Sequence, residues 1–418
     1  MIRLSETDRA MLGGAQGEAA AFAMTVLSGF AASVGAPGLL DITQAHIDGC
    51  LHHGQVSLDF VDRLAAGGGQ VRVPTTLNVG SMDLIHPELV RAPPALRADG
   101  RRLMEAHLAL GCAPSFTCAP YQTAARPAFG QQIAWGESNA IIFANSVIGA
   151  RTNRYGDFID LCCAITGRAP AWGLHLDENR HGTVLFRLSG FPPSLPASDA
   201  LYVAIGHIIG STSGDAVPVI EGLPPPDSED QIKALGAVAA SAGSVALFHA
   251  VGLTPEAPDL ATALGGRPPV RTIAIHPDDV AASLAGLSTV PEGTAISAVC
   301  LGTPHFSEQE WNRLLALLRH RPAPAVPIYV NTGRETWQRL ATDGRMAVAE
   351  AAGIIPVVDT CTYITAILGQ SDGAVMTNSG KWAHYAPSNL GVDVAFGALQ
   401  DCIASATAGH VVRHRSWR

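Results

Sequence analysis

The stretch from Phe116 to Ala164 concentrates side chains that can do chemistry. Burying a polar group costs free energy unless the group finds a partner, so polar residues between short apolar runs need a structural or functional reason. Such residues either build a hydrogen-bonded core or line a site, and we expect this stretch to line a site. Its thiol, carboxylate, hydroxyl, amide and guanidinium side chains include those of Cys118, Glu137, Ser138, Asn139, Asn145, Arg151, Arg154, Cys162 and Cys163.

A second group of reactive side chains surrounds Lys381, which has no carboxylate close by in the sequence. A lysine in such surroundings can bind a substrate carboxylate or act as a base, and the alternative is an ordinary surface lysine. Gly380-Lys381 lacks the earlier glycine of a phosphate-binding loop, so nucleotide hydrolysis is not supported. The polar neighbours of the lysine are Thr377, Asn378, Ser379, His384 and Tyr385.

The elements that must position these groups alternate between strands and helices in the second half of the chain. Ser307 and Glu310 form a capping-box pattern for one helix, and Pro277 marks the first turn of another. This alternation is typical of a parallel α/β sheet. The apolar runs predicted as its strands are Val245–Val251, Thr272–Ile275, Ala295–Leu301, Val326–Val330 and Ile354–Val358.

A parallel sheet brings the residues that follow its strands to one edge, where open α/β folds bind their ligands. Two thiols from distant parts of the sequence would therefore meet there, and the alternative is two unrelated buried cysteines. The residues predicted at this edge are His276, Cys300 with His305, Asn331 and Cys361.

The first half is expected to begin with helices and to end in a linker. Ser5 and Asp8 form a capping-box pattern before a helical region that extends to about residue 34, and Val71–Val73 is predicted as a strand. The proline-rich segment Pro218–Asp230 is predicted as a linker. We therefore expect subdomains 1–227 and 332–418 as a main body and 228–331 as an α/β subdomain.

Composition disfavours several classes of protein. The 27 basic and 36 acidic residues give a net charge of −9 without long like-charge runs, so no nucleic acid partner is expected. The start of the chain lacks the pattern of a secretory signal, and the alanine-rich run Ala19–Ala36 is too polar for a membrane span. Eight cysteines in such a chain favour buried or metal-binding thiols over disulfides. We expect a cytoplasmic protein without a membrane partner.

Together, six motifs resemble the aconitase X family, and the resemblance covers residues 1–418. It implies an aconitase-like catalytic region of several α/β/α subdomains with parallel sheets, and a swivelling domain carried by a small partner subunit. The motifs are Cys118-Ala119-Pro120-Tyr121, Ala134-Trp135-Gly136-Glu137-Ser138-Asn139-Ala140, Asn145-Ser146 to Asn153, Gly302-Thr303-Pro304-His305, Asp359-Thr360-Cys361 and Thr377-Asn378-Ser379-Gly380-Lys381.

The resemblance implies a lyase that dehydrates a small hydroxy acid with the help of iron. The favoured reaction converts cis-3-hydroxy-L-proline to pyrroline-2-carboxylate, and the large subunit of phosphomevalonate dehydratase is the alternative. Arg151 and Arg154 could serve a phosphate in that case. A metal-free α/β ligand-binding or assembly protein is the alternative of another class. A nicotinamide oxidoreductase is disfavoured because no glycine-rich fingerprint follows a strand.

Dehydration needs a base for the α-proton, an electrophile for the leaving oxygen and cations or dipoles for the carboxylate. The resemblance assigns the metal ligands to Cys118, Cys300 and Cys361. Thr303 stands where many members have cysteine before Pro-His, which leaves a 2Fe-2S cluster, a 4Fe-4S cluster and mononuclear iron open. The base is one of the chain's own candidates or a group on the swivelling domain. The catalytic candidates are Lys381, Ser379, Glu137 and Tyr385, and the substrate-binding candidates are Asn78, Ser138, Asn139, Arg151 and Asn378.

Overall fold

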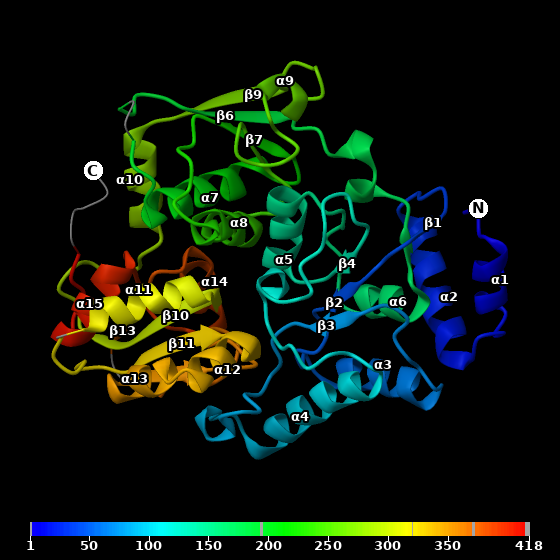
Figure 1. Ribbon diagram of the computed structural model, residues 1–418, viewed down its shortest axis with the longest axis horizontal. Helices are drawn as coiled ribbons and strands as arrows, with labels where there is room; N and C mark the ends of the chain where they lie inside the picture. Colours follow the sequence, from blue (N-terminus) through cyan, green and yellow to red (C-terminus); the bar gives the residue numbers. More distant parts are fainter. Residues whose placement is uncertain (1, 193–194, 320, 370–372, 414–418) are drawn as a thin grey trace. The chain divides into compact units, whose positions relative to one another are not determined.

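The computed structural model describes residues 2–192, 195–319, 321–369 and 373–413, which fold as two compact units (Figure 1). Unit 1 comprises residues 1–82 and 93–181, and unit 2 comprises residues 83–92 and 182–418. The subdomain boundaries expected from the sequence, 1–227, 228–331 and 332–418, differ from this division and stay a prediction. Within the described residues, no helix is both long enough and apolar enough to cross a membrane.

Unit 1 is built around a parallel three-stranded sheet in the order β3-β2-β4, with α6 packed on β2 and β4. A separate antiparallel pair joins β1 to β5. Ser5 and Asp8 cap the first helix as predicted. The elements are α1 (Glu6–Leu12), α2 (Glu18–Ser33), β1 (Leu39–Asp41), β2 (Ala45–Ile47), α3 (Gln55–Ala66), β3 (Thr75–Leu77), α4 (Pro94–Ala109), β4 (Ala134–Trp135), α5 (Ser138–Phe143), α6 (Ile159–Thr166) and β5 (Arg168–Pro170).

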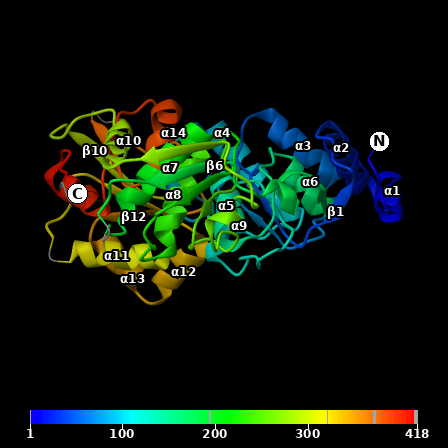
Figure 2. The ribbon, with the colours of Figure 1, turned by 90° about the horizontal axis from the view of Figure 1, so that it is seen from above.

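The first sheet of unit 2 is parallel and has the order β8-β7-β6-β9. Figure 2 shows α7 and α8 side by side, and these two helices pack closely together. Pro277 opens α10 as predicted. The elements are β6 (Val184–Leu188), α7 (Asp199–Ser213), β7 (Pro218–Glu221), α8 (Glu229–Ala242), β8 (His249–Ala250), α9 (Leu260–Ala263), β9 (Arg271–Ile275) and α10 (Pro277–Gly286).

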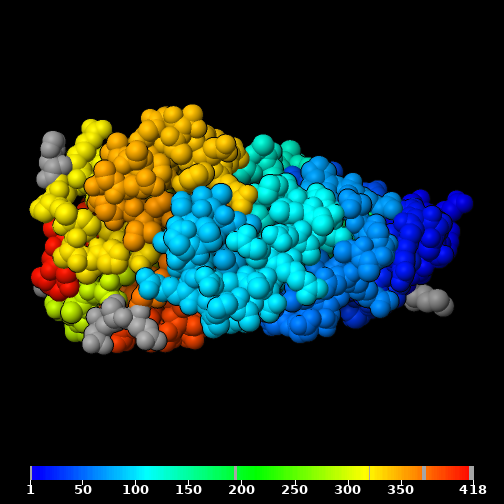
Figure 3. All heavy atoms as spheres, turned by 90° about the horizontal axis from the view of Figure 1, so that it is seen from below, coloured from blue at the N-terminus to red at the C-terminus, as the bar shows by residue number. Residues whose placement is uncertain are grey.

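The second sheet of unit 2 is also parallel and has the order β12-β11-β10-β13-β14. Trp311 and Leu314 of the helix capped by Ser307 and Glu310 enter the core of this sheet. The outer faces of α12 and α13, in orange, form part of the surface seen in Figure 3. The elements are β10 (Ile296–Phe306), α11 (Glu308–Leu318), β11 (Ile328–Thr332), α12 (Arg334–Thr342), α13 (Arg345–Ala351), β12 (Ile354–Val357), β13 (Ala374–Thr377), α14 (Gly380–Leu390), β14 (Val394–Phe396) and α15 (Leu399–Ala408).

Three local predictions were wrong. The five apolar runs divide between two sheets, because β8 and β9 pair within the first sheet and β10, β11 and β12 within the second; His276 therefore follows a strand of the first sheet. Pro218–Glu221 is strand β7 rather than linker, since it pairs with β6 and β8. Val71–Val73 is not a strand, because the N–H groups of residues 71 and 72 bind the carbonyls of Leu110 and Ala164.

Candidate metal and substrate site

The carboxyl edge of the sheet in unit 1 gathers polar side chains. Asp48 follows β2, Asn78 follows β3, and Glu137 lies two residues past the end of β4. Because the three strands are parallel and adjacent, these residues leave the sheet at the same edge. Asn78 and Glu137 were predicted from the sequence. Asp48 was not predicted, although it follows β2 as Asn78 follows β3.

Cys118 reaches the same edge because its segment runs along β3. The N–H of Thr117 donates to the carbonyl of Leu77 at 3.0 Å, so the chain arrives at Cys118 beside the end of the strand. Nδ2 of Asn139 donates to the carbonyl of Cys118 and to the hydroxyl of Tyr121, each at 2.9 Å. Cys118 is 3% exposed and Asn139 is fully buried. Asn139, predicted to bind substrate, therefore holds the backbone of a predicted metal ligand.

Three other predicted site residues already have hydrogen-bond or salt-bridge partners within unit 1. They are Glu137, Ser138 and Arg151. Glu137 caps α5, since its carboxylate accepts the N–H of Ala140 at 2.7 Å and the hydroxyl of Ser138 at 3.1 Å. Arg151 forms a salt bridge with Asp177. Glu137 and Ser138 thus stabilise a helix start, and their roles toward substrate stay predictions.

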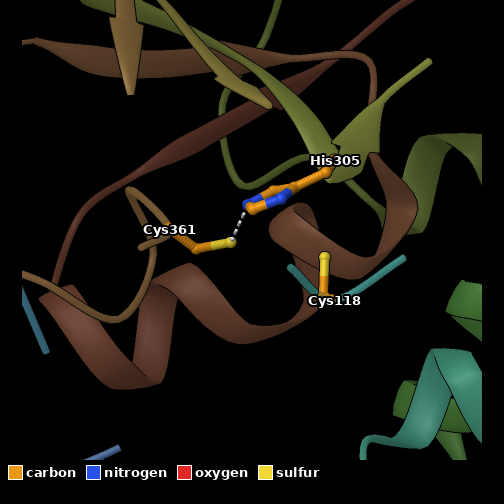
Figure 4. Close-up of side chains that lie close together, drawn as sticks. All are labelled: Cys118, His305 and Cys361. Atoms are coloured by element: carbon orange, nitrogen blue, oxygen red, sulfur yellow. Dashed lines mark hydrogen bonds between the residues drawn. The ribbon is translucent and has the colours of Figure 1, made fainter. Parts of the chain in front are cut away.

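In unit 2, a thiol and an imidazole meet at the carboxyl edge of the five-stranded sheet. His305 is near the end of β10, and Cys361 lies four residues past β12. Sγ of Cys361 and Nε2 of His305 are 3.6 Å apart (Figure 4). Cys361 is 1% exposed and His305 is fully buried. A thiol sulfur and an imidazole nitrogen that are both shielded from water are suited to binding a transition metal.

Cys361 is presented by a turn that two buried carboxylates hold. Asp359 has a φ of +65°, in the left-handed region that residues other than glycine rarely adopt. The guanidinium of Arg334 donates two hydrogen bonds to its carboxylate, and Asp83 accepts the N–H of Val358 at 2.8 Å. Burial raises the pKa of Asp359, and the bond to Arg334 opposes that rise.

Asn331 ties this turn to the neighbouring strand. Its Nδ2 donates to the carbonyl of Leu301 in β10 at 2.8 Å, and its Oδ1 accepts the N–H of Thr362 at 3.0 Å. Asn331 was predicted at the sheet edge, and it links β10 to the residue that follows Cys361. One buried amide thus joins the strand that carries His305 to the residue that follows Cys361.

Cys300 lies inside β10 rather than past its end, so its predicted place at the sheet edge was wrong. The strand continues to Phe306 and carries His305, instead of Cys300, to the thiol of Cys361. Burial raises the pKa of Cys300 to about 12. The ligand role of Cys300 stays a prediction. His305 was predicted at this sheet edge and lies there beside the thiol of Cys361, but it was not named as a metal ligand from the sequence.

Lys381 lies in the first turn of α14, and Ser379 is the N-cap of that helix. The hydroxyl of Ser379 accepts the N–H of Trp382 at 3.0 Å and donates to the carbonyl of Thr303. Lys381 is 3% exposed and lines a cavity of about 40 Å³ together with Asn378. Oδ1 of Asn378 is buried without a hydrogen-bond partner among the described residues. The cavity is therefore lined by a lysine and an asparagine side chain.

The remaining candidates pack against neighbouring side chains. The ring of Tyr385 stacks on Tyr363 with 5.7 Å between the ring centroids. Cys162 and Cys163 are buried in α6, and burial raises the pKa of both thiols, in line with a structural role.

Comparison with protein families matches all three domains described for one family. The first, second and third domains of aconitase X match residues 1–178, 182–285 and 296–408. The chain belongs to the aconitase X family. The identification made from the six motifs is confirmed.

Aconitase X relatives resemble this chain over nearly its whole length. Cis-3-hydroxy-L-proline dehydratase of Pseudomonas aeruginosa is 42% identical over 97% of this chain and 70% of that protein. The enzyme of the same name from Hypocrea jecorina is 37% identical over 98% of this chain and 69% of that protein. The phosphomevalonate dehydratase large subunit of Methanothermobacter thermautotrophicus is 33% identical over 94% of this chain and 96% of that protein.

A solved structure confirms the predicted fold. The crystal structure of Thermococcus kodakaraensis aconitase X in its holo-form matches with a TM-score of 0.87 and 30% sequence identity. The match covers 97% of this chain and 100% of the other. The predicted α/β architecture with several parallel sheets is therefore correct.

Proposed function

We propose that the protein is a hydro-lyase that converts cis-3-hydroxy-L-proline to pyrroline-2-carboxylate. The relatives that carry this name are 42% and 37% identical, whereas the phosphomevalonate dehydratase large subunit is 33% identical. In the molecule itself, the observation that carries the proposal is the buried thiol and imidazole pair of Cys361 and His305.

The same proposal assigns Cys118, His305 and Cys361 as ligands of an iron centre, either an iron–sulfur cluster or mononuclear iron. The donor chemistry fits, because two thiols and one imidazole are ligands that iron accepts in both kinds of site. All three residues are buried, which limits access of water. When bound, such a centre supplies a Lewis acid for the departing hydroxyl group. Cys300 remains a further candidate ligand.

The chain's own side chains bind the substrate, and the base that takes its proton belongs either to this chain or to a second subunit. Lys381 is suited to binding the substrate carboxylate. Its buried ammonium lies in the first turn of α14, so its positive charge adds to the positive end of the helix dipole, and both attract an anion. A base then takes the proton from C2 while the hydroxyl leaves C3. Glu137 and Tyr385 are the candidates in this chain, and a group on a second subunit is the other. The enamine so formed tautomerises to the product without a redox cofactor.

We further propose that a small swivelling-domain subunit works with this chain in the cytoplasm. The relatives named phosphomevalonate dehydratase large subunit support this partner, because their name implies a smaller subunit and this chain covers 96% and 99% of two of them.

The test of the reaction is an assay of the anaerobically purified protein, together with a co-expressed small subunit, on both substrates. We expect pyrroline-2-carboxylate from cis-3-hydroxy-L-proline and no turnover of phosphomevalonate. Turnover of phosphomevalonate alone would refute the proposal.

The test of the ligands compares iron per chain in C118S, H305Q, C361S and C300S with that in C402A. Cys402 is a buried thiol in the core of the five-stranded sheet, so C402A controls for the loss of any buried cysteine. We expect C118S, H305Q and C361S to lose iron and activity together, and C402A to keep both. Normal iron content and turnover in H305Q and C361S would reject the assignment. An iron-free wild type after cluster reconstitution would favour a binding protein.

A further inference from the structure

We infer that Lys233 is a positioning residue that holds His305 in place for the metal. The inference rests on the proposed function, because His305 is an iron ligand only under that proposal. Lys233 belongs to α8, and His305 lies near the end of β10 in the five-stranded sheet. Both residues, and all the groups that connect them, belong to unit 2.

The end of β10 has irregular support from its neighbouring strands. Its pairing with β13 ends at Cys300. Its pairing with β11 shifts register between Leu301 and Phe306. His305 lies within this shifted stretch, where the ladder is irregular and the backbone is free to bend. Contacts from outside the sheet are therefore needed to fix the backbone at His305.

The ammonium of Lys233 supplies such a contact. Its Nζ donates to the carbonyl of His305 at 3.5 Å, to Oδ1 of Asp230 at 2.8 Å and to the carboxylate of Glu310. An ammonium has three N–H donors, so these three acceptors use all of them. Lys233 lines the same small cavity as Lys381, but its donors are already committed to the protein. This favours a role in positioning over a role in substrate binding.

The two carboxylates also hold the residue that follows β10. Oγ of Ser307 donates to Oδ2 of Asp230 at 2.7 Å, and the N–H of Ser307 donates to Oε2 of Glu310 at 2.8 Å. Lys233 therefore grips the chain directly at residue 305 and, through the two carboxylates, at residue 307. These two attachments set the direction in which β10 ends, and that direction places the His305 ring.

The charge of Lys233 ties the three groups firmly together. Lys233 is 2% exposed and Asp230 is 9% exposed. Separating a buried ammonium from its carboxylates leaves uncompensated charges with a large desolvation cost. A methionine at position 233 has nearly the same length but donates no hydrogen bond, so K233M releases the carbonyl of His305. Groups that orient a metal ligand in this way contribute to the affinity for the metal.

The test is a double-mutant cycle of K233M and H305Q on cobalt(II) binding. Cobalt(II) is titrated into the full chain after removal of iron, and the thiolate-to-cobalt and d–d absorption bands report its affinity and coordination. K233M should weaken binding by about tenfold to hundredfold and shift the d–d bands. In the H305Q background, K233M should change the affinity by less than about twofold, because the ligand through which Lys233 acts is absent.

D199N is the matched control. Asp199 lies in α7 and binds Arg313 of α11 at 2.6 Å and Gln231 of α8 at 3.1 Å, so it contacts the same two helices as the Lys233 network. D199N neutralises this partly exposed carboxylate while the bonds to residues 305 and 307 stay in place. It should bind cobalt(II) within about twofold of the wild type.

Two results would overturn the inference. One is a loss of affinity in K233M that is equally large with and without His305, because Lys233 would then stabilise the fold rather than place a ligand. The other is a K233M protein that binds cobalt(II) as the wild type does. Urea unfolding shows whether each variant is folded. If K233M is not, S307A replaces it in the same cycle and is judged by the same two results, since it removes the bond to Asp230.

Failure of the proposed function gives different results. An H305Q protein with wild-type cobalt(II) affinity would reject His305 as a ligand, and the inference with it. A loss in K233M that depends on His305, in a protein whose iron form does not turn over cis-3-hydroxy-L-proline, would refute the proposed reaction. That outcome would leave the positioning role of Lys233 standing.

Discussion

Asn139 offers a sharp test of how the chain holds Cys118. Replacing it with alanine removes two buried hydrogen bonds, one to the carbonyl of Cys118 and one to the hydroxyl of Tyr121. A buried hydrogen bond contributes about 1 kcal/mol net, and an acceptor left unsatisfied adds a further cost of about 1 kcal/mol or more. N139A should therefore lower the free energy of unfolding by about 2–4 kcal/mol. It should also lower iron occupancy, because the backbone at Cys118 loses its anchor.

Equilibrium unfolding in urea of the metal-free protein measures the first effect, and iron per chain after reconstitution measures the second. N179A is the matched control. Asn179 is exposed, and its Nδ2 donates to the carbonyl of Gly173 at 3.0 Å, so its loss should change stability by less than about 0.5 kcal/mol. An N139A protein that unfolds at the same urea concentration as the wild type would refute the claim that this amide holds the Cys118 segment.

Two further predictions follow from buried charged or titrating groups. R334M should lower the free energy of unfolding by about 3 kcal/mol and reduce bound iron, because the buried carboxylate of Asp359, close to Cys361 in the chain, loses its guanidinium partner. Unfolding in urea and iron analysis measure the two effects. Wild-type values in both measurements would contradict the prediction. His107 is 2% exposed, and burial lowers its pKa to about 4. In the unfolded chain the pKa of this histidine is about 6.5, so the unfolded state takes up the proton at a higher pH than the folded state does. The free energy of unfolding therefore falls as the pH drops from 6.5 toward 4. H107Q keeps a donor for the carbonyl of Leu103 and should lose about 2 kcal/mol less than the wild type between pH 7 and pH 5 in urea unfolding, whereas an unchanged pH dependence would argue against this histidine as a source.

Local chemistry explains which parts of the molecule the sequence predicted. Ser5 and Asp8 cap α1, and Ser307 and Glu310 cap α11, because a capping box needs only residues three positions apart. Glu137 was predicted because it belongs to the Ala134–Ala140 motif, which is visible in a few neighbouring residues. Asn78 was predicted as a polar residue at the end of a strand, but the strand that precedes it is β3 rather than Val71–Val73.

Strand pairing was decided by contacts that lie far apart in the sequence. The apolar runs at β9 and β10 look alike, yet they enter different sheets, because β9 pairs with β6 whereas β10 pairs with β11 and β13. The same reason accounts for Cys300. The sequence shows where an apolar run begins, but the length of β10 is set by its pairing with β11 and β13, and that length carries His305 to the sheet edge.

The sequence by itself determined the family, the α/β class and the presence of thiols, amides and a lysine suited to dehydration. These properties depend on residue types and short spacings. Only the tertiary structure decided which imidazole meets Cys361, which amide holds Cys118 and which carboxylate stands beside Asn78. These contacts join residues 21 to 56 positions apart, so they exist only once the chain has folded.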